Sequence, residues 1–139
     1  MANVHEVSQF FENTKEKTGV GVWALLHEGK YVGKVVLRAS KSHVNGWNLK
    51  IGLAIYSGLV GKDKSLYVMG SGGGCGLDLV SWTMQDMMRE NAQEFRDYGI
   101  MVPVDEDDPI LNGRSLYEFM YNEWDKLFEL GGYKLIKVL

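Results

Sequence analysis

The residues whose types and spacing most suggest binding or catalysis form a glycine-rich run near the middle of the chain. Five of the seven residues from Gly70 to Gly76 are glycine, and the run holds the only cysteine of the protein. Glycine lets a ligand approach the backbone closely, and a helix that starts there presents unpaired N–H groups that favour anions. The run is therefore a candidate ligand-binding turn at the start of a helix. Its candidate residues are Gly72, Gly73, Gly74, Cys75, Gly76 and Asp78.

The common phosphate-binding motifs do not fit this run. A P-loop needs a lysine and then serine or threonine after its last glycine, whereas Leu77 and Asp78 stand there. A dinucleotide fingerprint needs a parallel β-α-β unit, whereas the flanking strands are predicted to be antiparallel. Asp78 is also predicted to cap the helix, and its carboxylate would occupy the donors that a phosphate needs. A nucleotide-binding turn and a purely structural crossover from strand to helix both remain open.

Cys75 is the candidate nucleophile of this run. A thiolate is favoured near a helix start, but nucleophilic catalysis also needs a base. His5, His27 and His43 are all distant in sequence, so a small enzyme using Cys75 is the last alternative. The histidines match no short zinc pattern, and the acidic run 105–108 lacks the residue spacing of a calcium loop. No metal or other cofactor is predicted.

Basic residues gather on one face of the strands that precede the run. The cluster predicted for the outer face of the sheet contains Lys30, Lys34, Arg38, Lys41 and Lys50, near Trp47 and His43. Basic side chains interleaved with an aromatic ring can bind nucleic acid. The formal net charge of −3 argues against a polyanion binder, so nucleic acid is not the predicted partner. A solvated sheet face is the structural alternative.

Aromatic residues of the chain have two possible roles, in the core or in an exposed patch. The residues in question are Trp23, Trp82, Trp124, Tyr117 and Tyr121. An exposed aromatic patch on a small protein marks an interface. The candidate residues for binding a partner are Trp47, Lys41, His43 and Trp82.

The strands that must position these residues follow from the hydrophobic pattern. Before the glycine-rich run, apolar and polar residues alternate between short turns, which predicts successive antiparallel strands. The predicted strands cover residues 20–27, 30–39, 48–57 and 65–69, and the apolar tail 133–139 predicts a last strand beside the sheet. In the second strand, the spacing of Tyr31 predicts that it shares a face with Val35 and Leu37.

Helices are predicted where apolar residues recur every three or four positions. They cover residues 4–18, 78–97 and 115–130, and Ser115 with Glu118 predicts a capping box at the start of the last one. The expected fold class is α+β in one domain, 1–139: an antiparallel meander of four to five strands with about three helices packed on one face. The open edges of such a sheet predict a homodimer.

Composition narrows the setting of the protein. One cysteine cannot form an internal disulfide, so a reducing cytoplasmic environment is expected. The chain has no run of about 18 apolar residues that would span a membrane. Its N-terminus lacks the basic start and apolar centre of a signal peptide.

A strand followed by Gly-Gly-x-Gly, an apolar residue, aspartate and a helix resembles an element of small phage and prophage accessory proteins. The matching residues are Gly73, Gly74, Gly76, Leu77 and Asp78. The resemblance implies a phage-encoded protein that acts in the host cytoplasm by binding. Its partner would be a host protein, for example a defence enzyme that it inhibits, or a nucleotide signal that it sequesters. Non-catalytic binding to a host protein is the function we expect, and binding of a nucleotide at the glycine-rich run is the alternative.

Overall fold

The computed structural model describes residues 18–41 and 46–139 of the chain. Two earlier expectations fall outside these ranges. They are the helix predicted at 4–18, apart from Thr18, which begins a strand, and the candidate residue His43.

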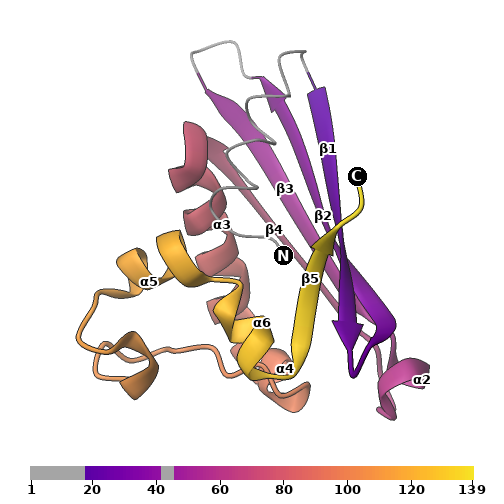
Figure 1. Cartoon of the computed structure of the whole chain (residues 1–139). Coiled ribbons are helices and arrows are strands. Elements are labelled where there is room, and N and C mark those ends of the chain that lie inside the picture. The colour runs from indigo at the N-terminus through magenta and orange to yellow at the C-terminus, as the bar shows by residue number, and fades with distance from the viewer. Residues whose placement is uncertain (1–17, 42–45) are drawn as a thin grey trace.

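Five antiparallel strands form one sheet in the order β4-β3-β2-β1-β5 (Figure 1). They are β1 (Thr18–His27), β2 (Lys30–Lys41), β3 (Trp47–Ile55), β4 (Leu66–Gly74) and β5 (Tyr133–Lys137). The first four form the predicted meander, and β5 pairs with β1 at the opposite edge. The predicted α+β fold is therefore confirmed. Any homodimer formed through a sheet edge would use β4 or β5.

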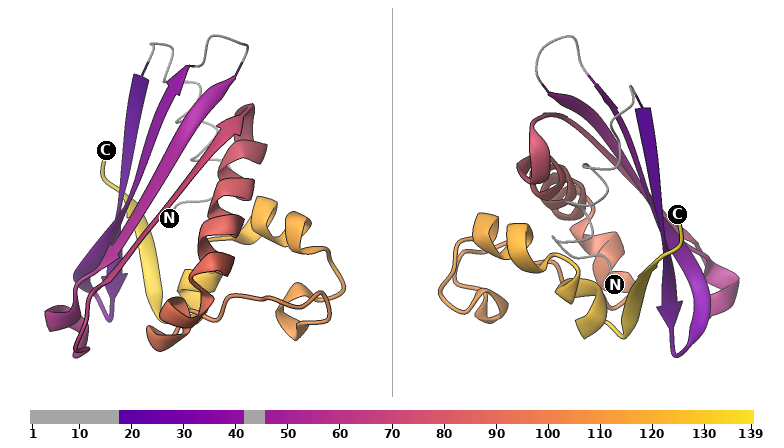
Figure 2. Two further views of the ribbon diagram at one scale, coloured as in Figure 1. Left: turned by 180° about the vertical axis from the view of Figure 1, so that it is seen from behind. Right: turned by 45° about the horizontal axis from the view of Figure 1, so that its top comes forward.

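Four helices of the described chain lie on one face of this sheet (Figures 1 and 2). They are α3 (Gly76–Glu90), α4 (Ala92–Asp97), α5 (Leu116–Glu123) and α6 (Lys126–Leu130). A short helix, α2 (Ser57–Val60), links β3 to β4, and a 3-10 helix spans Pro109–Leu111. We call the face that packs against α3 to α6 the inner face, and the opposite one the outer face.

The two long predicted helices are each interrupted once. α3 gives way to α4 at Asn91, where the side-chain amide nitrogen donates to the carbonyl of Met87 over 2.8 Å. An asparagine side chain that bonds to a nearby backbone carbonyl competes with the regular helix ladder. The second interruption separates α5 from α6 at Trp124 and Asp125. Both helical regions were predicted correctly, but neither is a continuous helix.

The hydrophobic core fills the space between the inner face and the helices. The sheet contributes fully buried side chains such as Trp23, Leu25 and Ile51. The helical layer contributes Met84, Met87, Met88, Phe95, Phe119 and Phe128. Methionine and aromatic side chains suit this position because they fill irregular gaps between a twisted sheet and crossing helices.

A bulge in β2 overturns the predicted position of Tyr31. Leu25 pairs with Gly33 but Leu26 pairs with Tyr31, so Val32 is an extra residue on β2. In a regular strand, the residues just before and just after a given position point to the same face. When that position is an extra residue, its two neighbours point to opposite faces. Tyr31 therefore lies on the outer face, where it is 50% exposed, rather than beside the buried Val35.

Candidate functional site

The glycine-rich run is mostly a strand, in contrast to the predicted turn. β4 continues to Gly74 and stays in register with β3 along its whole length, from Leu66 opposite Ile55 to Gly74 opposite Trp47. The predicted strand ended five residues earlier, at residue 69. Glycine has a low intrinsic preference for strands, so the pattern of residue types stops indicating a strand where glycines begin.

Helix α3 explains why two of these positions are glycine. A Cβ atom at Gly70 would lie 2.9 Å from the Cβ of Met87, and one at Gly72 would lie 2.5 Å from Oγ1 of Thr83. Both distances are far below an ordinary van der Waals contact. The lack of a side chain at Gly70 and Gly72 therefore lets helix α3 of the same chain pack close against β4. The inner side of Gly70 and Gly72 is already filled by protein.

The start of α3 also differs from the prediction. Cys75 occupies the N-cap position with extended backbone, and no side-chain hydrogen bond caps the helix there. Asp78 is the third residue of the helix rather than its N-cap. The helix begins earlier because the backbone turns directly after β4 ends at Gly74. A carboxylate in the first turn still interacts favourably with the helix dipole, and its negative charge opposes an anionic ligand at this end.

The side chain of Asp78 instead belongs to an aromatic cluster. Tyr117 of α5 donates a hydrogen bond from its hydroxyl to Oδ1 of Asp78 over 2.5 Å. The Tyr117 ring lies 5.2 Å from the Trp82 ring and 6.0 Å from the Tyr121 ring, measured between centroids. We call Trp82, Tyr117 and Tyr121 the aromatic patch. The structure thus joins two predicted site residues, Asp78 and Trp82, through Tyr117.

The aromatic patch is accessible on the helical side of the molecule. Trp82 is 48% exposed, and both tyrosines are partly exposed. The remaining members of the predicted aromatic group, Trp23 and Trp124, are buried in the core. Some of the predicted aromatic residues therefore lie in the core, and the others form an exposed patch.

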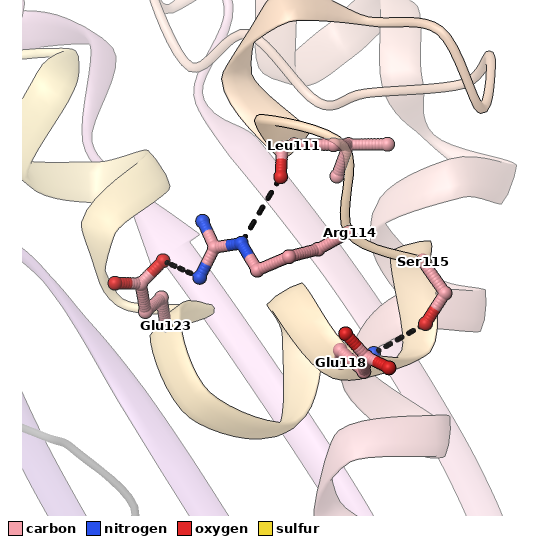
Figure 3. A network of polar contacts seen from close by, with 5 residues as sticks. All are labelled: Leu111, Arg114, Ser115, Glu118 and Glu123. Carbon is pink, nitrogen blue, oxygen red and sulfur yellow. Dashed lines mark hydrogen bonds and ion pairs between the residues drawn. The ribbon is translucent and has the colours of Figure 1, made fainter.

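A polar network fixes the start of α5, which carries two of the three aromatic rings (Figure 3). The hydroxyl of Ser115 accepts a hydrogen bond from the backbone N–H of Glu118 over 3.1 Å, which confirms the predicted cap. Arg114 forms an ion pair with Glu123 over 2.6 Å and donates from Nε to the carbonyl of Leu111 over 3.0 Å. The loop before α5 and the end of α5 are thereby held together.

The surroundings of the aromatic patch are acidic. The hydrogen bond to Asp78 raises the pKa of Tyr117, with smaller contributions from desolvation and from the carboxylate charge. Asp86 follows Trp82 by four residues, on the same exposed stripe of α3. Residues 76–130 carry thirteen acidic and four basic side chains. The patch therefore combines exposed rings with the nearby carboxylates of Asp78 and Asp86.

The predicted basic cluster is divided between the two faces of the sheet. Lys34, Arg38 and Lys50 are exposed on the outer face, as predicted. Lys41 and Trp47 pair at the end of β2 and β3, with the ammonium nitrogen 5.6 Å from the ring centroid. Trp47 packs against the core from the inner side, because it has the same strand parity as the buried Leu49.

Of the three histidines weighed as a base for Cys75, only His27 lies within residues 18–41 and 46–139, and it is far from Cys75. The thiol is exposed, but His27 lies at the hairpin end of the sheet, where its ring is tilted against that of Tyr133 with 4.7 Å between centroids. The register places Cys75 at the other end, next to the Gly74–Trp47 pair. Within residues 18–41 and 46–139, no three or more His, Cys, Asp or Glu side chains are grouped to hold a metal ion. None of the described helices is long and apolar enough to cross a membrane.

Comparison with known protein families, with curated proteins and with solved structures gave no significant match to this chain.

Proposed function

We propose that this protein is a non-catalytic binding protein that contacts a partner protein through the aromatic patch. The observation that carries the proposal is the contiguous set of partly exposed rings, Trp82, Tyr117 and Tyr121, at the contact between α3 and α5. Tryptophan and tyrosine dominate the binding energy of protein interfaces because they bury large areas in well-packed pockets. Three such rings in contact on one surface fit that role.

The aromatic patch is held in place before any partner arrives. The Tyr117 ring is fixed between its hydrogen bond to Asp78 and its contacts with the two other rings. A side chain that is already ordered loses less conformational entropy on binding, so more of the contact energy appears as affinity. The surrounding acidic residues favour a partner with a basic rim around an apolar pocket.

The likeness to phage accessory proteins supports a host protein as the partner. In that setting the chain acts in the host cytoplasm by occupying a surface of the host protein, for example of a defence enzyme, and inhibiting it. No chemical step by Cys75 is needed for this activity.

Capture from a lysate of the host bacterium tests the proposal. The tagged wild-type chain is compared with Trp82→Ala, and the matched control is Leu130→Ala, which removes another exposed hydrophobic side chain of the helical layer. Loss of a tryptophan hot spot of about 2 kcal/mol weakens binding roughly 30-fold. We expect one protein to be enriched by the wild type and by Leu130→Ala but not by Trp82→Ala. Enrichment of no protein, or equal capture by all three chains, would contradict the proposal.

A further inference from the structure

The outer face of the sheet carries a second, chemically different surface. Its side chains form rows across the strands, because antiparallel neighbours stand directly opposite one another. One row runs through Val20, Arg38, Lys50 and Ser71, and the row two residues further along runs through Val22, Val36, Gly52 and Met69. A third row runs through Ala24, Lys34, Ala54 and Tyr67. Adjacent rows are about 7 Å apart.

The positive charge on these rows is not neutralised. The five strands contain no aspartate or glutamate. Arg38 and Lys50 stand directly opposite each other on β2 and β3, an arrangement that costs free energy in an antiparallel sheet. In the described parts of the chain, no carboxylate lies within ion-pair distance of Arg38, Lys50 or Lys34. An anionic ligand would relieve this repulsion.

A groove lies at the two opposed cations. It has a volume of about 440 Å³ and is lined by Arg38 and Lys50 together with Ser40, Asn48 and Val20. The groove therefore offers two positive charges beside a hydroxyl and an amide that can donate hydrogen bonds, which is the chemistry that binds a phosphate group.

Exposed aromatic rings lie at the other end of the same face. Tyr56 is 6.5 Å from both Tyr31 and Tyr67, measured between ring centroids. Tyr67 is 68% exposed and Met69 is 71% exposed. Both line a mainly apolar groove of about 500 Å³ that also includes Lys34. A sheet face with exposed rings next to cations is a surface on which unpaired bases stack.

We propose that the outer face binds single-stranded nucleic acid. Arg38, Lys50 and Lys34 contact the phosphates, and bases stack on Tyr67 and Tyr31. A single strand is favoured over a duplex because its bases are available for stacking, and the described strands of this face offer side chains rather than a helix that could enter a groove. The net charge of −3 does not oppose this ligand, because the acidic excess belongs to residues 76–130 on the opposite side of the sheet. The ligand differs from the proposed partner protein in both class and surface.

Fluorescence anisotropy with labelled oligo-dT and oligo-rU of about 20 nucleotides tests this proposal. Three phosphate contacts predict a slope of about −2 for the logarithm of affinity against the logarithm of salt concentration, so binding weakens about 20-fold between about 50 and 200 mM salt. The Arg38→Ala/Lys50→Ala variant should reduce the slope to about −0.7. The dT and rU arms show whether DNA or RNA is the stronger ligand.

Two single variants separate stacking from charge. Tyr67→Ala should weaken binding about tenfold without changing the salt slope, since stacking of a base is uncharged. Lys62→Ala, which removes an exposed cation from the loop after α2, is the matched control and should leave affinity nearly unchanged. Trp82→Ala should also bind normally, so failure of this proposal is distinguishable from failure of the proposed protein interface. Circular dichroism confirms that each variant is folded.

Several results would overturn the proposal. One is the absence of binding at about 50 mM salt and protein concentrations up to about 100 μM. Another is displacement of the oligonucleotide by polyphosphate or polyglutamate as effectively as by unlabelled oligonucleotide, which would show a general anion surface without base stacking. Equal affinity for a duplex, or an unchanged affinity of Tyr67→Ala, would also remove the single-strand assignment.

Discussion

Replacement of Gly70 by alanine tests the idea that the glycine-rich run exists to admit helix α3. The added Cβ would lie 2.9 Å from the Cβ of Met87 and 3.3 Å from the backbone carbonyl oxygen of Thr83. Neither atom can swing away, because both are fixed to the backbone of α3. The helix must therefore shift away from β4, or the strand must bend.

The size of the effect follows from two opposing contributions. Overpacking a buried contact costs about 1–3 kcal/mol. Alanine also restricts the unfolded chain more than glycine does, which stabilises the fold by about 0.4–1 kcal/mol. We expect Gly70→Ala to lower the free energy of unfolding by about 2 kcal/mol, since its neighbours are rigid.

Gly52→Ala is the matched control for this change. Gly52 lies on the adjacent strand β3 and points to the outer face, where an added Cβ meets no atom within 4 Å. Only the unfolded-chain contribution applies there, so this variant should be as stable as the wild type or up to about 1 kcal/mol more stable. Thermal unfolding followed by circular dichroism should then place the two midpoints about 10 °C apart in a domain of this size.

A second pair of variants locates the contact. At Gly72 the nearest atom to an added Cβ is Oγ1 of Thr83, which belongs to a side chain and can be removed. Gly72→Ala should destabilise by about 1 kcal/mol, and Gly72→Ala/Thr83→Ala should recover most of that loss. Equal stabilities of Gly70→Ala and Gly52→Ala, or the absence of any recovery in the double variant, would refute the close packing of α3 on β4.

Other parts of the structure give further predictions. Ser115→Ala removes the cap of α5 and should lower the free energy of unfolding by about 1 kcal/mol, as measured by urea titration. Asp78→Asn should lower the pKa of Tyr117 toward its ordinary value of 10.0, which NMR of ring-labelled tyrosine can follow. The folded-state pKa of Tyr117 is raised, so the hydrogen bond from its protonated hydroxyl contributes to stability below pH 10. That contribution is lost as the pH rises from there through the folded-state pKa. An unchanged Tyr117 pKa in Asp78→Asn would contradict this account. Arg114→Gln breaks a partly exposed ion pair with Glu123 and should cost less than about 1 kcal/mol, with a smaller loss at high salt. The molecular mass measured by light scattering tests the predicted homodimer, and a monomeric mass would exclude it.

Local patterns in the sequence were sufficient for most of the architecture. Alternating residues indicated the strands of the meander, and the three- to four-residue period of apolar positions indicated both helical regions. The cap at Ser115 was predicted because capping depends on residues only three positions apart. In each case the interactions that decide the structure are close in sequence.

The features that were missed depend on distant residues or on backbone geometry. The glycines of β4 belong to a strand because β3 and α3 hold them there, which no local preference reveals. The bulge at Val32 moves Tyr31 to the outer face, and its only local sign is Gly33, the next residue, where an added Cβ would lie 2.0 Å from the backbone oxygen of Ala54. Asp78 and Tyr117 are 39 residues apart in sequence, so their hydrogen bond could be found only from the structure. The sequence therefore indicated a glycine-rich turn, a basic sheet face and an aromatic interface, but not how Asp78 joins the aromatic patch or how Tyr31 joins the outer face.

The separation of charge between the two sides of the sheet gives the molecule a large electric dipole, which its small net charge conceals. The outer face carries the exposed Lys34, Arg38 and Lys50, and no strand contains an acidic residue, while residues 76–130 carry an acidic excess of nine. At physiological salt the electric field of each surface extends about 8 Å. A charged molecule nearby therefore responds to the charge of the side that it approaches rather than to the net charge of the whole protein. Such a field turns the protein during diffusional encounter and accelerates association in the correct orientation. Anionic and cationic ligands are thereby directed to opposite sides of the same small domain.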